Sequence, residues 1–235
     1  MAAASATSDY PRGNGTGGGW TGADCALLLG LVAFAALRTA SLVFSPLELG
    51  VDEAQYWLWS TGFDFGYYTK PPLTSWIIGL SHSLFGHHEW AVRLPAPWLH
   101  LATSLLLWRA ADWLAGPAAG RIAAMIWMTL PSIALGSFVI STDTPLLLCW
   151  SAGVLALVGV LTGRLRERRG MLLAGGAFGA AMLAKYAAIY GLAGLALFVL
   201  ATSVLSRDTE RQKVIGWRGL GLFAFGMVVV ASPNI

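Results

Sequence analysis

The amino-acid sequence predicts an all-α protein, a polytopic bundle of about seven transmembrane helices, on three observations. Hydrophobic residues make up 56% of the 235 residues and charged residues only 11%, less than half of the roughly 25% charged residues of soluble domains. The mean hydropathy is +0.64. The 11 Trp and 28 Gly residues are typical of membrane interfaces and membrane helices. This composition excludes an ordinary soluble domain and a disordered chain.

Long segments that are free of charge, or nearly so, indicate the individual spans, because a helix needs about 20 apolar residues to cross a bilayer. The predicted spans are 25–44, 91–115, 122–142, 144–163, 170–184, 186–206 and 219–235. The first contains Arg38, and the fifth is short and Gly-rich and stops at Lys185. Residues 1–23 are rich in Ala, Gly, Ser and Thr and are predicted to be a flexible tail. Residues 24–235 are then the transmembrane domain.

Basic residues predict the orientation of the spans. Ten of the fifteen Lys and Arg residues flank or fill three loops, which we therefore expect to be cytoplasmic. These loops are 116–120, 164–169 and 206–218. The same rule breaks the apolar stretch after 170 at Lys185, because one long helix would place the last of these basic loops outside. Since the charges are sorted by membrane side and not gathered into one patch, we expect no nucleic-acid partner.

The opposite, outer face collects the remaining polar groups. It comprises the long loop 45–90 and the turns 140–145, 184–187 and 232–235. The long loop holds five of the twelve acidic residues, and its Trp-rich stretches at 54–60 and 73–85 are too short to span. We predict that these stretches are helices lying in the membrane interface. Acidic residues beside a few isolated lysines at a membrane surface favour a site for a phosphorylated, lipid-borne substrate.

Three of the candidate residues on this face have structural alternatives. Asp52 is equally well explained as the cap of a helix over 53–60, with Gln55 completing a capping box. Thr142-Asp143-Thr144-Pro145 has the pattern of a helix start, with a cap and a proline in the first turn. Lys185 has the alternative of snorkelling at a helix break, although an ionisable residue at such a break is a functional candidate.

Three other features are interpreted structurally. Adjacent His87 and His88 cannot both face one ion from a helix, so we predict a solvated loop there. Gly175-x-x-x-Gly179 predicts close packing of two helices. Arg38 is costly inside a span unless it pairs, and the sequence does not identify its partner.

Six motifs follow one another on the outer face. They are Asp52-Glu53-Ala54 with Tyr56, Tyr67-Tyr68-Thr69-Lys70-Pro71-Pro72-Leu73, Arg93-Leu94-Pro95, Thr142-Asp143-Thr144-Pro145-Leu146, Ala184-Lys185-Tyr186 and Ser232-Pro233-Asn234. In this order they resemble the polyprenyl-phosphate-sugar glycosyltransferases of the membrane C superfamily, which include the protein O-mannosyltransferases and the bacterial lipid A aminoarabinose transferases. The resemblance covers about residues 45–235.

The resemblance implies an integral enzyme of the inner (plasma) membrane. Such an enzyme moves a sugar from a polyprenyl-phosphate donor, for example on undecaprenyl phosphate, to a lipid, glycan or protein acceptor on the extracytoplasmic face. Asp52 corresponds to the acid of the family's leading loop and would be the general base toward a hydroxyl acceptor. Lys70 corresponds to the lysine of the family's Tyr-x-Lys-Pro-Pro segment, which is associated with the donor phosphate.

The remaining candidates take supporting roles in this hypothesis. Lys185 and Arg93 are further cations for the donor phosphate, and Glu53 and Asp143 are candidates to contact sugar hydroxyls or an ion. Tyr67 and Tyr68 are expected to pack against the sugar or the isoprenoid. These residues are Glu53, Tyr67, Tyr68, Arg93, Asp143 and Lys185.

Two departures from the family pattern leave alternatives open. Thr69 stands where aminoarabinose transferases can carry an acid that helps to hold a metal, so we assign no metal ligand and leave a divalent cation open. Family members continue well beyond this point, and the chain is therefore expected to correspond to their N-terminal portion. A lipid-linked sugar transporter or flippase, and a noncatalytic assembly subunit, are the alternatives from other classes of protein.

Overall fold

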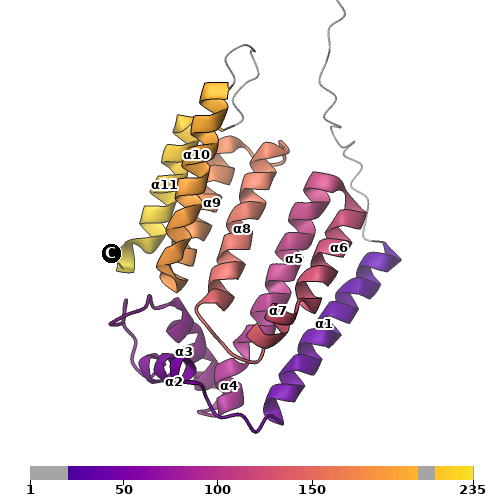
Figure 1. Cartoon of the computed structure of the whole chain (residues 1–235), viewed down its shortest axis with the longest axis vertical. Coiled ribbons are helices and arrows are strands. Elements are labelled where there is room, and N and C mark those ends of the chain that lie inside the picture. Colours follow the sequence, from indigo (N-terminus) through magenta and orange to yellow (C-terminus); the bar gives the residue numbers. More distant parts are fainter. Residues whose placement is uncertain (1–20, 206–214, 235) are drawn as a thin grey trace, which may run out of the picture.

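The computed structural model describes residues 21–205 and 215–234, and every regular element in these ranges is a helix (Figure 1). Seven of these helices occupy the predicted spans. They are α1 (Gly22–Val43), α5 (Pro95–Ala115), α6 (Pro117–Thr129), α8 (Asp143–Leu161), α9 (Glu167–Ala184), α10 (Ile189–Leu205) and α11 (Trp217–Ala231). The others are α2 (Val51–Ser60), α3 (Leu73–Phe85), α4 (Glu89–Arg93), α7 (Pro131–Gly136) and the 3-10 turns η1 (Tyr186–Ala188) and η2 (Ser232–Asn234). The predicted all-α class is confirmed for the described residues.

Three helical segments in the described ranges are long and apolar enough to cross a membrane, by length and composition alone. They are Gly22–Val43, Asp143–Leu161 and Tyr186–Val204. Helices α5, α6, α9 and α11 occupy the other four predicted spans, but they do not combine the same length and hydropathy. The structure therefore confirms an all-helical chain with three candidate spans, and the full set of seven remains a prediction.

One helix starts earlier than its predicted span, and one predicted span is wrong. Helix α1 begins at Gly22, ahead of the predicted span 25–44, because Thr21 and Asp24 form a capping box, with the Thr21 amide donating to the Asp24 carboxylate at 2.9 Å. The predicted span 122–142 is not one helix, since α6 ends at Thr129 and α7 starts at Pro131. A proline lacks the amide that would continue the helix. Residues 1–20 of the predicted tail, and most of the predicted loop 206–218, lie outside the described residues.

The predicted break at Lys185 is confirmed. Lys185 has an extended backbone (φ −158°, ψ 130°) between α9 and η1, and α9 and α10 run in opposite directions on either side of it (Figure 1). Figure 1 also shows that α2, α3, α4 and α7 gather at one end of the molecule, together with the start of α8 and the ends of α9 and α11. The segments predicted to face outward therefore meet at one end.

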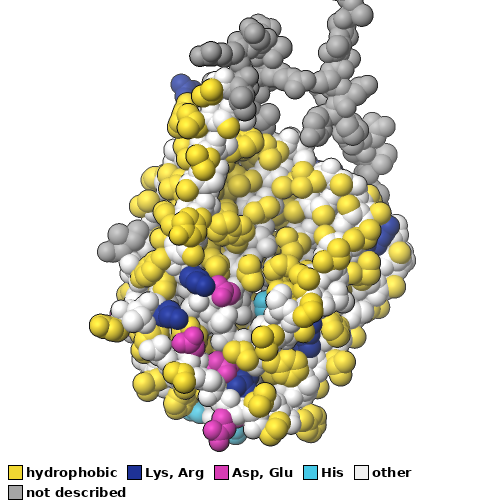
Figure 2. All heavy atoms as spheres, in the orientation of Figure 1, with side chains coloured by type: hydrophobic (Ala, Val, Ile, Leu, Met, Phe, Trp, Pro, Cys, Tyr) yellow, Lys and Arg dark blue, Asp and Glu magenta, His cyan; other side chains and the backbone are white. Residues whose placement is uncertain are grey.

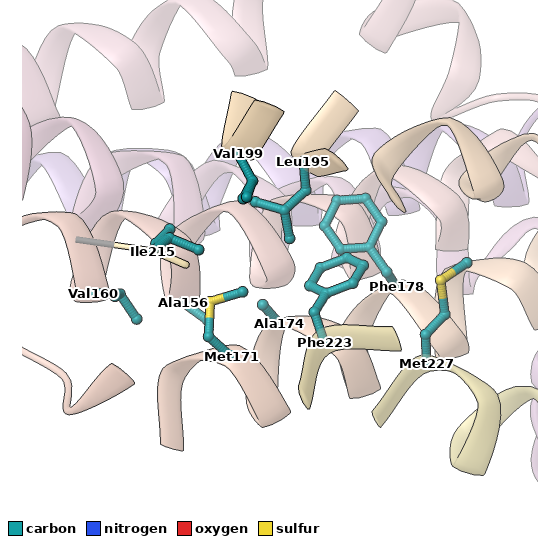
Figure 3. Packing of buried hydrophobic residues seen from close by; sticks show 10 residues of the cluster. All are labelled: Ala156, Val160, Met171, Ala174, Phe178, Leu195, Val199, Ile215, Phe223 and Met227. Carbon is teal, nitrogen blue, oxygen red and sulfur yellow. The ribbon is translucent and has the colours of Figure 1, made fainter. Parts of the chain in front are cut away.

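The largest apolar core joins α8, α9, α10 and α11 (Figure 3). At its centre the rings of Phe178 and Phe223 lie 5.2 Å apart. Gly175 and Gly179 bring α9 against α11, since a Cβ added at Gly179 would lie 2.6 Å from the carbonyl oxygen of Met227, and one at Gly175 would overlap the Phe223 backbone. The predicted packing role of these glycines is confirmed. This core fixes the relative positions of α8 and α9, which carry Asp143 and Lys185.

Candidate active site

Helix α2 supplies two acids that face different surroundings. Gly50 precedes the helix, and its amide donates to the Glu53 carboxylate at 3.0 Å. Asp52 therefore lies inside the first turn, so its interpretation as a helix cap completed by Gln55 is wrong. The Asp52 side chain is exposed, whereas Glu53 is 1% exposed. A rotation of about 100° per residue separates the two side chains, and only Asp52 is open to a ligand.

Lys70 is a half-buried cation in the loop between α2 and α3. Its ammonium donates a hydrogen bond to the hydroxyl of Tyr56 at 3.1 Å and lies 5.5 Å from the centre of the same ring. This hydrogen bond raises the pKa of Lys70 above its ordinary 10.5; partial burial opposes the shift, and the charges of Asp52 and Asp143 add to it. Lys70 is thus a cation that Tyr56 holds in place, and the negative charges of Asp52 on α2 and Asp143 on α8 favour its protonated form.

Asp143 and Lys185 form the second pair of charges in this cluster. Helix α8 begins at Asp143, as the sequence predicted, and the Asp143 amide donates to the Ser141 hydroxyl at 3.2 Å. The Lys185 ammonium donates to the Asp143 carboxylate at 2.7 Å, and the two side chains are 45% and 52% exposed. Such an exposed pair contributes about 0–1 kcal/mol to stability. It can therefore exchange partners with a charged ligand at little cost.

Glu53 and Arg93 form a separate, buried ion pair. The Arg93 guanidinium donates twice to the Glu53 carboxylate, at 2.9 and 2.7 Å, and once each to the carbonyl oxygens of Leu47 and Glu48 at 2.8 Å. The Glu53 carboxylate also accepts from the Ile140 amide at 3.0 Å. The side chains of Arg93 and Glu53 are 4% and 1% exposed. The structure therefore joins these two predicted site residues to each other in the interior.

The loop that carries Lys70 is held by aromatic and amide contacts. The Tyr67 ring stacks on Trp59, with centres 5.0 Å apart and planes 3° apart, while Tyr68 is 98% exposed. The Asn234 amide donates to the Phe65 carbonyl at 2.7 Å and accepts from the Tyr186 hydroxyl at 3.0 Å. The contacts tie η1 and η2 to this loop.

Sequence reasoning did not place Tyr56, Trp59, Tyr186 or Asn234 in the site. Tyr56, Tyr186 and Asn234 do fall within the quoted motifs, which was the available signal. For Trp59, only its place in the Trp-rich stretch 54–60 was available.

Figure 2 shows how the charges are distributed on one face of the molecule. The acidic side chains on this face lie in its lower part, over and beside α2 and α3, interleaved with Lys and Arg, and hydrophobic side chains cover much of the upper part. Within the described ranges, no group of three or more His, Cys, Asp or Glu side chains is arranged to hold a metal ion. The chemistry available from the described cluster is that of two ammonium groups, which can bind a phosphate, and an exposed carboxylate, which can take a proton.

Comparisons with known proteins identify the family of this chain. Residues 69–235, which include Lys70, Asp143 and Lys185, match the dolichyl-phosphate-mannose-protein mannosyltransferase family. The chain is 37% identical over 215 residues to the lipid A galacturonosyltransferase RgtD of Rhizobium johnstonii, an alignment that covers 88% of this chain and 42% of that protein. The chain thus spans less than half the length of this curated relative, and no solved structure matches it significantly. By the extent of the family match, the chain belongs to the dolichyl-phosphate-mannose-protein mannosyltransferase family, within the C superfamily of membrane glycosyltransferases.

Proposed function

We propose that the protein transfers a sugar from a polyprenyl-phosphate donor to an acceptor on the extracytoplasmic face of the plasma membrane. The observation that carries the proposal is the hydrogen bond that fixes the Lys70 ammonium on Tyr56, where the charges of Asp52 and Asp143 also favour its protonated form. A fixed cation beside an exposed carboxylate suits a reaction in which a phosphate leaves and a hydroxyl loses a proton. A transporter would be expected to bind its substrate near the middle of the membrane, whereas α2 and the start of α8, which carry Asp52 and Asp143, lie at one end of the bundle (Figure 1).

The proposed arrangement in the membrane follows the positive-inside rule. Seven spans are formed by α1, α5, α6 with α7, α8, α9, η1 with α10, and α11. Helices α2 and α3 lie in the outer interface, where exposed Leu58, Leu80 and Leu84 contact lipid. The site then opens at the level of the lipid headgroups, so a polyprenyl donor can present its phosphate while its chain stays in the bilayer.

In the proposed reaction, the donor phosphate is the leaving group. The Lys70 ammonium binds its oxygens, and Lys185 exchanges the Asp143 carboxylate for the phosphate as negative charge develops there. The Asp52 carboxylate takes the proton of an acceptor hydroxyl as its oxygen attacks the anomeric carbon. The bond from that carbon to the phosphate oxygen breaks, and a single displacement inverts the anomeric centre. An acceptor phosphate would need no base, and Asp52 would then orient a substrate.

The remaining candidates are assigned by their surroundings. We propose that Glu53 and Arg93 position α2, because they are buried against each other. Tyr68, which is almost fully exposed, contacts the sugar or the isoprenoid, and Tyr67 holds the loop. Asp143 contacts sugar hydroxyls once Lys185 has moved. The acceptor is a lipid, glycan or protein, and the name of the relative, a lipid A galacturonosyltransferase, makes a lipid the first to test.

The test uses the full-length protein in detergent with a radiolabelled polyprenyl-phosphate sugar. Asp52→Asn should abolish transfer to a hydroxyl acceptor, and Lys70→Met should chiefly raise the KM for the donor, while membrane insertion is retained. Asp64→Asn is the matched control, because Asp64 is an exposed acid of the same loop whose carboxylate accepts from the adjacent Phe65 amide at 2.7 Å. Normal transfer by Asp52→Asn would refute the base assignment. Donor movement across vesicles without transfer would favour a transporter.

A further inference from the structure

Arg38 is a buried cation in α1 whose partners come from the broken helix α6–α7. Its side chain is 5% exposed. The guanidinium donates to the carbonyl oxygen of Met128 at 2.7 Å and to the hydroxyl of Ser137 at 3.1 Å, and it lies 4.4 Å from the centre of the Phe34 ring. A charge inside a membrane helix is costly and usually has a functional reason. The sequence did not identify the partner of Arg38; the structure shows that it is the carbonyl end of α6 together with the Ser137 hydroxyl.

The helix break explains why a carbonyl is free for Arg38. Helix α6 ends at Thr129, because Leu130 turns to an extended conformation (φ −58°, ψ 133°) before Pro131. The last carbonyl groups of a helix have no amide partner within the helix. Arg38 satisfies that of Met128, and its positive charge also suits the negative end of the α6 dipole. Arg38 thereby holds the break together from the side of α1.

The second bond of Arg38 reaches the segment that leads to the proposed site. Ser137, whose hydroxyl also donates to the Ile133 carbonyl at 2.7 Å, begins the connection 137–142 between α7 and α8. Three residues later, the Ile140 amide donates to the Glu53 carboxylate at 3.0 Å. Helix α8 then starts at Asp143. The connection is therefore fixed at two points, by Arg38 from α1 and by Glu53 from α2.

We infer that Arg38 is a positioning residue for transfer, acting through the connection 137–142 on the place of the Asp143 carboxylate. This inference rests on the proposed function. The carboxylate sits on the first residue of α8, so a shift of the connection moves it relative to Lys70 and Lys185. A misplacement of about 1 Å in an active site can cost roughly 100-fold in rate. Arg38 touches no substrate in this scheme and sets the geometry of a group that does.

The experiment is a double-mutant cycle in the full-length protein, with transfer from the labelled donor as the readout. Arg38→Met keeps the side-chain length and removes both donors, and we expect it to lower kcat roughly 10- to 100-fold. In the Asp143→Asn background the same change should have little further effect, because the carboxylate that Arg38 positions is already absent. Arg109→Met is the control: Arg109 is 58% exposed, lies in α5 and pairs with Asp112, and its loss should leave kcat unchanged.

Two milder variants separate positioning from folding. Ser137→Ala removes one link while keeping the cation, and should lower kcat in the same direction by less. Arg38→Lys should restore part of the activity that Arg38→Met loses, since one ammonium can replace only part of the guanidinium fork. The inference would be overturned if both Arg38→Met and Ser137→Ala kept the wild-type kcat. It would also be overturned if the loss of kcat in the Arg38→Met, Asp143→Asn double variant equalled the product of the two single losses. Absence of transfer by the wild-type protein would instead count against the proposed function.

Discussion

The buried pair of Glu53 and Arg93 predicts that α2 opens when one partner loses its charge. Glu53→Gln keeps the size of the side chain and leaves the Arg93 guanidinium buried without a counterion. Removing one partner of a buried pair typically costs about 3–5 kcal/mol. Arg93 keeps its bonds to the carbonyls of Leu47 and Glu48, which lowers the cost. The single Gln oxygen cannot accept hydrogen bonds from Gly50, Ile140 and Arg93 together, and this raises the free-energy cost.

This loss of stability should appear as more frequent local opening of α2, the helix that carries Asp52. A loss of about 3–5 kcal/mol corresponds to between two and four orders of magnitude in the opening equilibrium. Amide hydrogen exchange, measured by mass spectrometry on peptides from α2, reports this equilibrium directly. Asp143→Asn breaks an exposed pair worth only about 0–1 kcal/mol, and is the control expected to leave exchange in α2 nearly unchanged.

A double variant sharpens the test. Replacing a buried pair by apolar residues of similar size is often neutral or stabilising, so Glu53→Leu with Arg93→Met should recover much of the protection that Glu53→Gln loses. Wild-type exchange in Glu53→Gln would show that the pair does not hold α2. A double variant that opens as readily as Glu53→Gln would show that the hydrogen bonds to Gly50 and Ile140 matter more than the charges.

Two further predictions concern Lys70 and the packing of α9. Tyr56→Phe removes the hydrogen bond that raises the pKa of Lys70; the ammonium then deprotonates at lower pH, and the alkaline limb of the transfer–pH profile should move down. If the alkaline limb does not move in Tyr56→Phe, the titration of Lys70 does not cause that limb. Gly175→Ala would overlap the backbone of Phe223 and should cost about 1–3 kcal/mol of stability, seen as a lower thermal midpoint in detergent. Gly176→Ala meets only an ordinary contact at 3.6 Å and should match wild type.

The raised pKa of Lys70 also has a definite sign for stability. The folded state binds its proton more tightly than the unfolded state, so this contribution is complete below the ordinary pKa of 10.5. It is lost as the pH rises through the folded pKa. Tyr56→Phe should therefore flatten the alkaline end of the stability profile and leave its acidic end unchanged.

Local patterns predicted the features that depend on neighbouring residues. The break at Lys185 followed from loop charge, the helices over 54–60 and 73–85 from short apolar stretches, and the start of α8 at Asp143 from its capping pattern; all three are present. The prediction of one unbroken span over 122–142 is wrong, because it relied on hydropathy alone. Pro131 lacks the amide that would continue α6, so the helix ends before it.

Contacts between distant segments were beyond reach of these patterns. Glu53 and Arg93 are 40 residues apart and Arg38 and Ser137 are 99 apart, so their pairing depends on how the helices pack. The motif resemblance gave Asp52 the base role and Glu53 a supporting one, but only the structure shows that Asp52 is exposed and Glu53 buried. The distinction arises because successive side chains of a helix point about 100° apart, and packing decides which direction faces the core.

The sequence by itself determined that this chain is helical and apolar. It also predicted that the polar motifs fall in loops on the same side of the helices, because composition and the order of charges along the sequence are properties of the chain alone. The tertiary structure alone decided which charges are buried and which are accessible. It joined Glu53 to Arg93 in the interior, left Asp52, Asp143 and Lys185 exposed, and left Lys70 half-buried. A buried ion must be paired by whatever the fold brings to it, and that partner is set by packing between helices far apart in the chain.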